Sequence, residues 1–181
     1  MLVLQPEGEG RSKRAMYQHN REPELKYDTA QICLNGHVIN RRSESWPVSN
    51  SPHCSKCGAK TITQCPKCNT KIRGGYFGGM PSMRVERPDP FCYQCGAAYP
   101  WTESGLSSAR ELLREIDRLD ENEKGVLSRS LDDLVRETPN TPVAIFRFKQ
   151  LVSKVGKPAA DALKSILVDV IVESAKRQIW P

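Results

Sequence analysis

Apolar residues recur at helical spacing throughout the second half of the chain. Within Leu106–Leu119 they fall three and four positions apart, which predicts a helix with one buried face. Two spacings resemble a reciprocal N-terminal cap, Ser108 with Glu111 and Asp120 with Glu123. A second helix is predicted to carry Val126, Leu127, Leu131, Leu134 and Val135. This helix should end before Pro139, because proline cannot continue a helical hydrogen-bond ladder.

Two more helices are predicted toward the C-terminus. The third begins with Thr141 as its cap and Pro142 at its first position, and it ends at Gly156. The fourth runs from near Pro158 to about Gln178 and is apolar on more than one side, which is typical of a helix buried between neighbours or in an oligomer contact. The pattern therefore predicts an all-α four-helix domain.

The first half of the chain has a different pattern, with short apolar runs separated by turn-forming Gly, Pro and Asn. Short strands are predicted at Gln31–Leu34, Val38–Asn40, Lys60–Gln64, Lys71–Arg73 and Met83–Val85. This region has too few apolar residues to form a core by itself, and we therefore expect bound metal to stabilise it. The predicted organisation is a disordered tail (residues 1–26), a small metal-stabilised β region of tandem zinc ribbons (27–101) and a C-terminal helical domain (102–181).

Cysteine spacing supports the expectation of metal. Six of the seven cysteines form three C-x-x-C pairs, and the seventh lies four residues before a histidine. The eight candidate ligands are Cys33, His37, Cys54, Cys57, Cys65, Cys68, Cys92 and Cys95. Eight ligands suit two tetrahedral Zn²⁺ ions per chain, and an odd cysteine total argues against a disulfide framework. We found no secretory signal and expect a reduced, cytoplasmic protein.

The sequence leaves the ligand pairing open. Sequential pairing places the first four ligands on one ion and the last four on the other, and it closes shorter loops than a cross-brace. His53 precedes Cys54 and competes with His37 as the nitrogen ligand. A redox dithiol at Cys65-Pro-Lys-Cys68 is the alternative chemistry, but the residues that follow lack the helix such a pair normally opens.

The charge of the chain is unevenly distributed. The whole formal net charge of +6 lies in the first 101 residues, which hold 14 basic and 8 acidic side chains. Residues 102–140 carry net −4 and residues 141–181 net +4, so the two helical hairpins either complement each other or the last one offers a basic surface.

A mean hydropathy of −0.54 and no long apolar run exclude a membrane-spanning chain. Both zinc sites are filled by protein ligands and no catalytic motif occurs, so we expect no enzyme.

Arginines alternate with aromatic residues in the loops between the cysteine pairs. The candidate nucleic-acid or partner contacts are Arg41, Arg42, Arg73, Tyr76, Phe77, Arg84 and Arg87. Such a set can stack on bases and pair with phosphates. The alternative is that the aromatic residues cover the small ribbon core or dock it on the helices.

Three cysteine-containing stretches resemble one known family. "ICLNGHVIN", "HCSKCGAKTITQCPKCNTKIRGGY" and "FCYQCGAAYPWT" are similar to a family of uncharacterised bacterial proteins, a domain of unknown function with tandem zinc ribbons. The resemblance implies a bacterial source and a metal role for the eight ligands, and it implies no activity. The stretches "TPVAIFRFKQLVSKVG" and "ILVDVIVESAKRQI" more loosely resemble helical modules of bacterial phage-defence proteins.

We therefore expect a non-enzymatic zinc-binding adaptor with a protein partner. A nucleic-acid-binding zinc ribbon, regulatory or linked to phage defence, is the alternative, and it predicts steeply salt-dependent affinity. A redox or zinc-release sensor is a third hypothesis. The C-terminal helices could also support a homo-oligomer.

Overall fold

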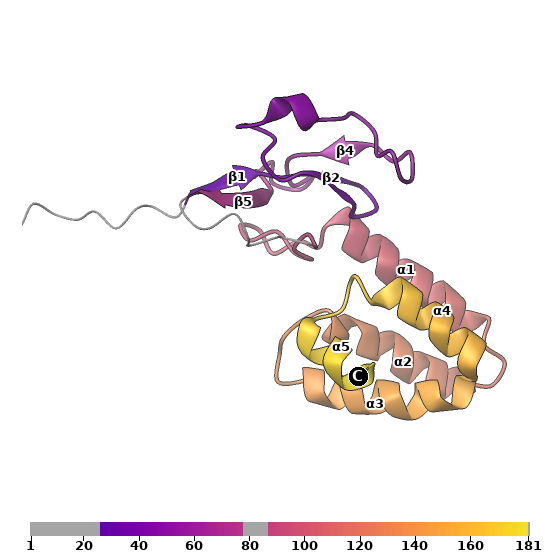
Figure 1. The fold of residues 1–181 in the computed structure, drawn as a ribbon. Helices are drawn as coiled ribbons and strands as arrows, with labels where there is room; N and C mark the ends of the chain where they lie inside the picture. Colours follow the sequence, from indigo (N-terminus) through magenta and orange to yellow (C-terminus); the bar gives the residue numbers. More distant parts are fainter. Residues whose placement is uncertain (1–25, 78–86, 181) are drawn as a thin grey trace, which may run out of the picture.

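The computed structural model describes residues 26–77 and 87–180 and divides them into two modules (Figure 1). The β module, up to residue 99, contains β1 (Lys26–Thr29), β2 (Gln31–Cys33), β3 (Val38–Asn40), the 3₁₀ turn η1 (Pro47–Ser49), β4 (Thr61–Ile62) and β5 (Arg73–Phe77). The helical module, residues 100–180, contains α1 (Pro100–Arg114), α2 (Glu121–Leu134), α3 (Thr141–Val155), α4 (Lys157–Leu167) and α5 (Glu173–Ile179). The predicted fold class, metal-ligand-rich β followed by all-α, is confirmed.

Two small antiparallel sheets form the β module. One has the strand order β3-β2-β4, and the other pairs β1 with β5. The predicted strand Val38–Asn40 is found as such, and the one at Lys60–Gln64 shortens to Thr61–Ile62. Strand β1 was not predicted, because its sequence KYDT lacks an apolar alternation. The expected strand Met83–Val85 and the expected tail up to residue 25 lie outside the described residues.

The core of the β module is small. Its buried cluster consists of Ala30, Ile32, Cys65, Ile72, Cys92, Tyr99 and Trp101. Two of these seven residues are candidate metal ligands, and the two largest aromatic rings, Tyr99 and Trp101, stack with centroids 4.5 Å apart. Apolar burial on this scale is far less than a conventional domain of this length provides.

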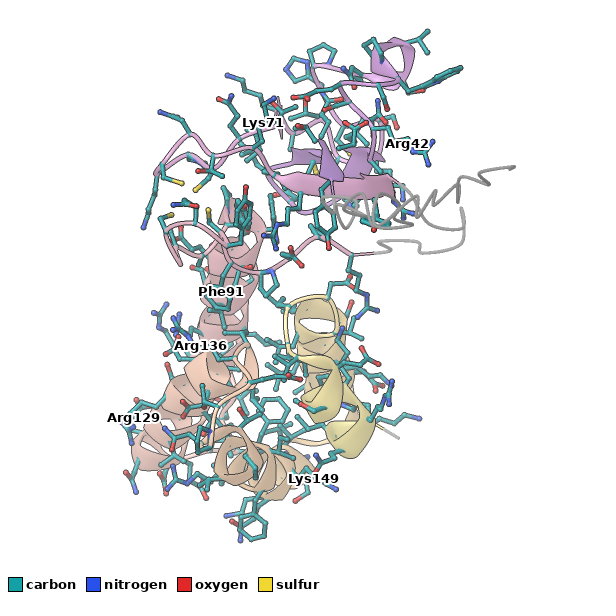
Figure 2. All side chains as sticks on the ribbon, turned by 90° about the vertical axis from the view of Figure 1, so that its left-hand side faces the viewer. Arg42, Lys71, Phe91, Arg129, Arg136 and Lys149 are labelled. Atoms are coloured by element: carbon teal, nitrogen blue, oxygen red, sulfur yellow. The ribbon has the colours of Figure 1, made fainter. Side chains whose placement is uncertain are left out.

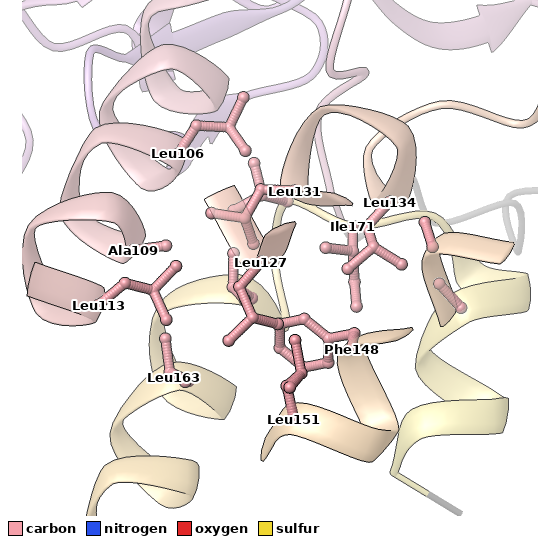
Figure 3. Packing of buried hydrophobic residues seen from close by; sticks show 14 of the residues in the cluster. Leu106, Ala109, Leu113, Leu127, Leu131, Leu134, Phe148, Leu151, Leu163 and Ile171 are labelled. Atoms are coloured by element: carbon pink, nitrogen blue, oxygen red, sulfur yellow. The ribbon is translucent and has the colours of Figure 1, made fainter. Parts of the chain in front are cut away.

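The helical module has a conventional apolar core. Nineteen buried residues form one cluster, to which every helix contributes. Figure 3 shows Leu113, Leu127, Phe148 and Leu163 converging from α1, α2, α3 and α4. The longest helices described, α1 and α3, have 15 residues each, so no described helix reaches the roughly 20 apolar residues needed to span a bilayer.

Helix boundaries follow the local sequence, with one correction at a cap. Asp120 and Glu123 form the predicted capping box at the start of α2. Thr141, predicted as the cap of α3, is instead the first residue of that helix. Its hydroxyl donates to the carbonyl oxygen of Arg136 (2.6 Å) and so ties the α2–α3 connection together. Gly156 ends α3 with φ of 84°, as its position predicted.

The predicted fourth helix is in fact two helices, α4 and α5. The chain leaves helical geometry after Val168, and the backbone N–H of Val172 donates to the carbonyl oxygen of Leu134 at the end of α2 (3.0 Å). Val170 and Ile171 in the connection are buried in the core. The break explains why this segment is apolar on more than one side, since its parts face the core in different directions.

A short set of hydrogen bonds joins the two modules. Pro90 lies just before the last C-x-x-C pair, and its carbonyl oxygen accepts from Tyr99 N (3.0 Å) and Thr102 Oγ1 (2.9 Å). The indole N–H of Trp101 donates to the carbonyl oxygen of Asp89 (3.0 Å). Helix α1 therefore begins directly from the base of the last cysteine hairpin (Figure 1).

Candidate metal centres

The β module has four tight turns that each hold a pair of candidate ligands, and the three C-x-x-C turns share one hydrogen-bond pattern. In the three C-x-x-C turns the backbone N–H of the first cysteine donates to a carbonyl five residues later. These bonds are Cys54 N to Ala59 O (2.9 Å), Cys65 N to Thr70 O (2.8 Å) and Cys92 N to Ala97 O (2.8 Å). An antiparallel bridge flanks each turn, between His53 and Lys60, Gln64 and Lys71, and Phe91 and Ala98. The fourth turn, between β2 and β3, holds Cys33 and His37 and has a Cys33 N to His37 O bond of 3.0 Å.

Each of the three C-x-x-C turns needs one residue in the left-handed region. Gly58 and Gly96 follow the second cysteines of their pairs with φ of 70° and 69°, as the sequence predicted. Asn69 fills the equivalent position after Cys68 with φ of 58°. Sequence reasoning missed Asn69, although asparagine is the residue other than glycine that enters this region most readily.

The first cluster consists of Cys33, His37, Cys54 and Cys57, whose ligand atoms all lie within 4.8 Å of one another. His37 Nδ1 is 3.5 Å from the sulfur of Cys33 and 3.5 Å from that of Cys54. The sulfurs of Cys33 and Cys57 are 3.8 Å apart. Strands β2 and β3 supply one side of the cluster, and the 54–57 turn supplies the other.

The second cluster consists of Cys65, Cys68, Cys92 and Cys95, within the same 4.8 Å limit. The sulfurs of Cys65 and Cys95 are 3.8 Å apart, and those of Cys68 and Cys92 are 3.6 Å apart. The two clusters gather the ligands in sequential order, and the cross-brace grouping is not observed. His53 lies outside both clusters, in the exposed bridge with Lys60.

These separations fit a tetrahedral ion. Zinc bonds of about 2.3 Å to sulfur and about 2.0–2.1 Å to nitrogen give sulfur–sulfur edges of about 3.8 Å and sulfur–nitrogen edges of about 3.5 Å. The observed 3.6–3.8 Å and 3.5 Å edges have these lengths. A disulfide would need about 2.05 Å, and all seven cysteines are free. The structure thus contains two Cys/His groups suited to metal binding.

Neighbouring donors support negative charge on the sulfurs. The backbone N–H of His37 donates to Cys33 Sγ (3.3 Å), and the side-chain amide of Asn35 donates to Cys57 Sγ (3.5 Å). In the second cluster the Thr70 hydroxyl lies 3.3 Å from Cys68 Sγ and can donate to a thiolate. Such contacts orient the ligands of a metal and stabilise their charged form.

Each cluster contains a thiol whose pKa is lowered and a thiol whose pKa is raised, Cys57 and Cys33 in the first and Cys92 and Cys95 in the second. The backbone N–H of Ala59 is the main cause that lowers the pKa of Cys57 to about 6. Burial opposes charge on Cys92, but the backbone N–H groups of Cys95 and Gln94 outweigh it and lower its pKa to about 6 as well. The Ala97 amide favours charge on Cys95, yet neighbouring thiols and burial raise its pKa to about 11. Adjacent thiols cannot all ionise together unless a cation offsets their repulsion.

The arginine and aromatic candidates do not form one surface. Arg73 is exposed and lies over the ring of Tyr93 at 3.8 Å and that of Tyr27 at 5.3 Å. Tyr76 is half-buried, and its ring lies 5.7 Å from that of Tyr27. Arg42 is exposed on the β module (Figure 2).

The remaining candidates lie elsewhere. Arg41 and Arg87 line a cavity between the modules, where Arg87 Nη1 donates to the carbonyl oxygen of Val168 (2.7 Å). Phe77 ends β5 opposite Lys26, and its side chain is outside the described part. Arg84 lies outside the described residues altogether. The described arginines therefore face at least two different regions.

Comparison with known proteins shows which family this chain belongs to. The family model described as "Uncharacterized protein conserved in bacteria (DUF2321)" matches residues 26–179. The match begins at β1 and ends in α5, so it covers both modules. No curated protein and no solved structure matches the chain.

Proposed function

The chain belongs to the bacterial family DUF2321, whose description gives no activity, and from its own geometry we propose a non-enzymatic zinc-binding adaptor protein. The observation that carries the proposal is the pair of complete four-ligand clusters with tetrahedral edge lengths. Thiolate and imidazole ligands in tetrahedral sets favour Zn²⁺ over the oxygen-seeking Mg²⁺ and Ca²⁺.

Zinc in these clusters would have a structural role. Cys33, His37, Cys54 and Cys57 complete the first set and four cysteines complete the second, so no coordination position is left for water or substrate. The ion supplies the charge that lets neighbouring thiols ionise together. The protein residues close the turns, and they orient the sulfurs through backbone and Asn35 donors.

The adaptor role rests on exposed apolar side chains in both modules. In the β module Trp46 is 62% exposed and Val48 is 80% exposed, on and beside the η1 turn. In the helical module Val143 and Phe146 are exposed on the outer side of α3. Exposed aromatic residues at protein surfaces are characteristic anchors of protein–protein contacts.

The loop that carries Trp46 is held by the side chains of buried Asn40 and exposed Asn50. Asn40 is 8% exposed, and its side-chain amide donates to the carbonyl oxygen of Trp46 (2.8 Å) and to Asn50 Oδ1 (2.7 Å). The side-chain amide of Asn50 donates to the carbonyl oxygen of Ser43 (3.0 Å). Two side chains thus fix the loop at both ends, and a partner would meet a pre-organised tryptophan at a low entropic cost.

Asp28 fixes the same loop from β1. Its carboxylate accepts from the backbone N–H groups of Thr29 (2.6 Å), Glu44 (3.2 Å) and Ser45 (3.3 Å), and from the Ser45 hydroxyl. Burial opposes its charge, but these donors outweigh burial and lower the pKa of Asp28. The carboxylate remains ionised at neutral pH, which favours a constant loop conformation.

A metal count tests the zinc assignment. Native mass spectrometry of protein purified without added metal should give two Zn²⁺ per chain, and Cys54→Ser should reduce the count to one. Ser55→Ala is the matched control, since Ser55 is exposed in the same turn and ligates nothing. Zinc release by mild peroxide from the wild type would favour the redox-sensor alternative instead.

Site-specific crosslinking tests the adaptor role. A photoreactive amino acid at Val48 should capture a protein in bacterial cells, and the purified protein should then bind this chain directly. Trp46→Ala should weaken that binding by about tenfold or more, and Ser49→Ala on the same turn should not. Equal binding of Trp46→Ala and the wild type, or capture of nucleic acid with steeply salt-dependent affinity, would contradict the proposal.

A further inference from the structure

A cavity of about 580 Å³ lies between the two modules, beside the first Cys/His cluster. Its walls come from the β2–β3 hairpin, the turn between Cys54 and Cys57, the residues just before the last cysteine hairpin, the start of α1, the end of α4 and the α4–α5 connection. The volume falls within the range of about 300–1,000 Å³ that is usual for small-molecule sites. Sites between modules are also among the commonest positions for ligands.

The charge of the cavity wall is positive. Arg41, Lys56 and Arg87 line it against one acidic residue, Asp169. Arg87 is already engaged, since its Nε lies 3.2 Å from Asp169 Oδ1 and its Nη1 donates to the carbonyl oxygen of Val168. Within residues 26–77 and 87–180, no ion pair to the side chain of Arg41 or Lys56 is found. These two cations from the β module are therefore the groups that can bind an incoming anion.

His37 adds a neutral donor to the same wall. Its Nδ1 faces the sulfurs of Cys33 and Cys54 at 3.5 Å, and the residue also lines the cavity. Once Nδ1 ligates a metal, the remaining ring proton is on Nε2, where it can be donated to a ligand or to water. This single contact rests on the proposed zinc centre; the two cations do not.

The helical side of the cavity combines apolar side chains with Ser104 and Asp169. Trp101 at the start of α1, Ile166 in α4 and Val170 in the following connection contribute to it. Gly105 allows α1 to approach this connection closely, because a Cβ at that position would lie 2.6 Å from a methyl carbon of Val170. Apolar side chains in the same cavity as two cations suit a ligand with an organic body and a charged end, rather than a bare inorganic anion.

We infer that this cavity binds a small organic anion, whose phosphate or carboxylate group pairs with Arg41 and Lys56 while its body lies against Trp101 and Ile166. Guanidinium groups bind phosphate and carboxylate through paired hydrogen bonds, and an ammonium adds a point charge. Because the two cations belong to the β module and Trp101 and Ile166 to the helical module, the ligand would contact both modules at once.

Isothermal titration of the zinc-loaded full chain tests the inference. The probes are ADP, citrate and inorganic phosphate, which separate an organic phosphate, an organic carboxylate and a bare anion. We expect ADP or citrate to bind with a Kd below about 1 mM and inorganic phosphate to bind more weakly. Binding of ADP alone would identify a phosphate site, and binding of citrate alone a carboxylate site.

Substitutions of the two cations test whether the ligand binds in the cavity. Arg41→Gln and Lys56→Gln should each weaken the binding by about tenfold or more, because each removes a charge-assisted contact. Lys149→Gln is the control, since Lys149 is exposed on α3 at the far end of the molecule (Figure 2), and it should leave affinity unchanged. The inference is overturned if neither organic probe binds, if phosphate binds as tightly as both, or if Arg41→Gln binds like the wild type. The zinc count of the same samples separates this failure from a failure of the zinc assignment.

Discussion

The two modules of this protein reach a folded structure by different means. The helical module buries nineteen residues in one apolar cluster, whereas the buried cluster of the β module has seven members and includes two cysteines. In the β module, four hydrogen-bonded turns gather eight Cys and His side chains into two clusters, and under the proposed function metal in these clusters replaces the apolar packing of the helices. A change that removes metal should therefore unfold one module, and a change that removes apolar volume should destabilise the other.

Acidification should produce the largest difference in stability between the two modules. The thiol pKa values of Cys57 and Cys92 are lowered from about 9 to about 6, so their contribution to stability is present at high pH and is lost as pH falls through about 6. Bound metal favours the thiolates further, so release is expected at or below that pH. Both ions should leave and the β module should unfold, while the helical circular-dichroism signal persists.

Native mass spectrometry and two-dimensional NMR along a pH series measure both events. Returning the sample to neutral pH with Zn²⁺ should restore the β-module resonances, which controls for irreversible damage. Loss of both modules at the same pH would contradict separate stabilisation.

Phe148→Ala should have the next largest effect, on the helical module alone. The Phe148 ring is fully buried between the helices (Figure 3) and meets Trp180 edge-on at 6.1 Å. Removing a buried ring costs about 3–5 kcal/mol of unfolding free energy. Phe146→Ala is the matched control two residues away, because this ring is 67% exposed and should change stability by less than about 0.5 kcal/mol.

Thermal unfolding followed by circular dichroism gives the stability of both variants. The zinc count should remain at two in each. A fall in the zinc count of Phe148→Ala would show that the helical core supports the metal clusters and that the modules are less independent than their cores indicate.

Arg87→Ala should have the smallest effect, on the contact between the modules. Its ion pair with Asp169 is exposed, with 44% and 72% of the two side chains accessible, so the loss should be below about 1 kcal/mol. Arg110→Ala removes a similar ion pair, to Asp132, within the helical module. Thermal scans should show a slightly lower helical transition for Arg110→Ala and nearly unchanged transitions of both modules for Arg87→Ala. A drop of several kcal/mol for Arg87→Ala would mean that the modules fold as one unit.

The sequence predicted helices better than strands, for physical reasons. The period of apolar residues and the Asp120 cap are local signals, and they located α2 closely. The break between α4 and α5 depends on a backbone hydrogen bond from Val172 to Leu134, which no local pattern reveals. Strand β1 likewise exists because it pairs with β5, 44 to 51 residues further along the chain, and its own sequence is polar.

Ligand residues were easier to identify than contact surfaces. Spacing alone identified all eight residues that the structure gathers into the two clusters, since the geometry of a C-x-x-C turn is local. The grouping into two clusters followed from the preference for short loops. The sequence did not indicate what the arginines contact. Arg87 lies in a loop of the β module, and in the folded chain it forms an ion pair with Asp169 in the helical module.

The direct passage from the last cysteine hairpin into α1 has a consequence for dissecting this protein. Pro90 and Asp89 accept hydrogen bonds from Tyr99, Trp101 and Thr102, so the first turn of α1 is bonded to the base of the second cluster. A fragment that starts at residue 102 would lose both acceptors, and one that stops at residue 101 would leave Trp101 without the helix it begins. The second cysteine hairpin and the start of α1 are thus held together by hydrogen bonds, and any fragment made to separate the modules should keep residues 89–102 together.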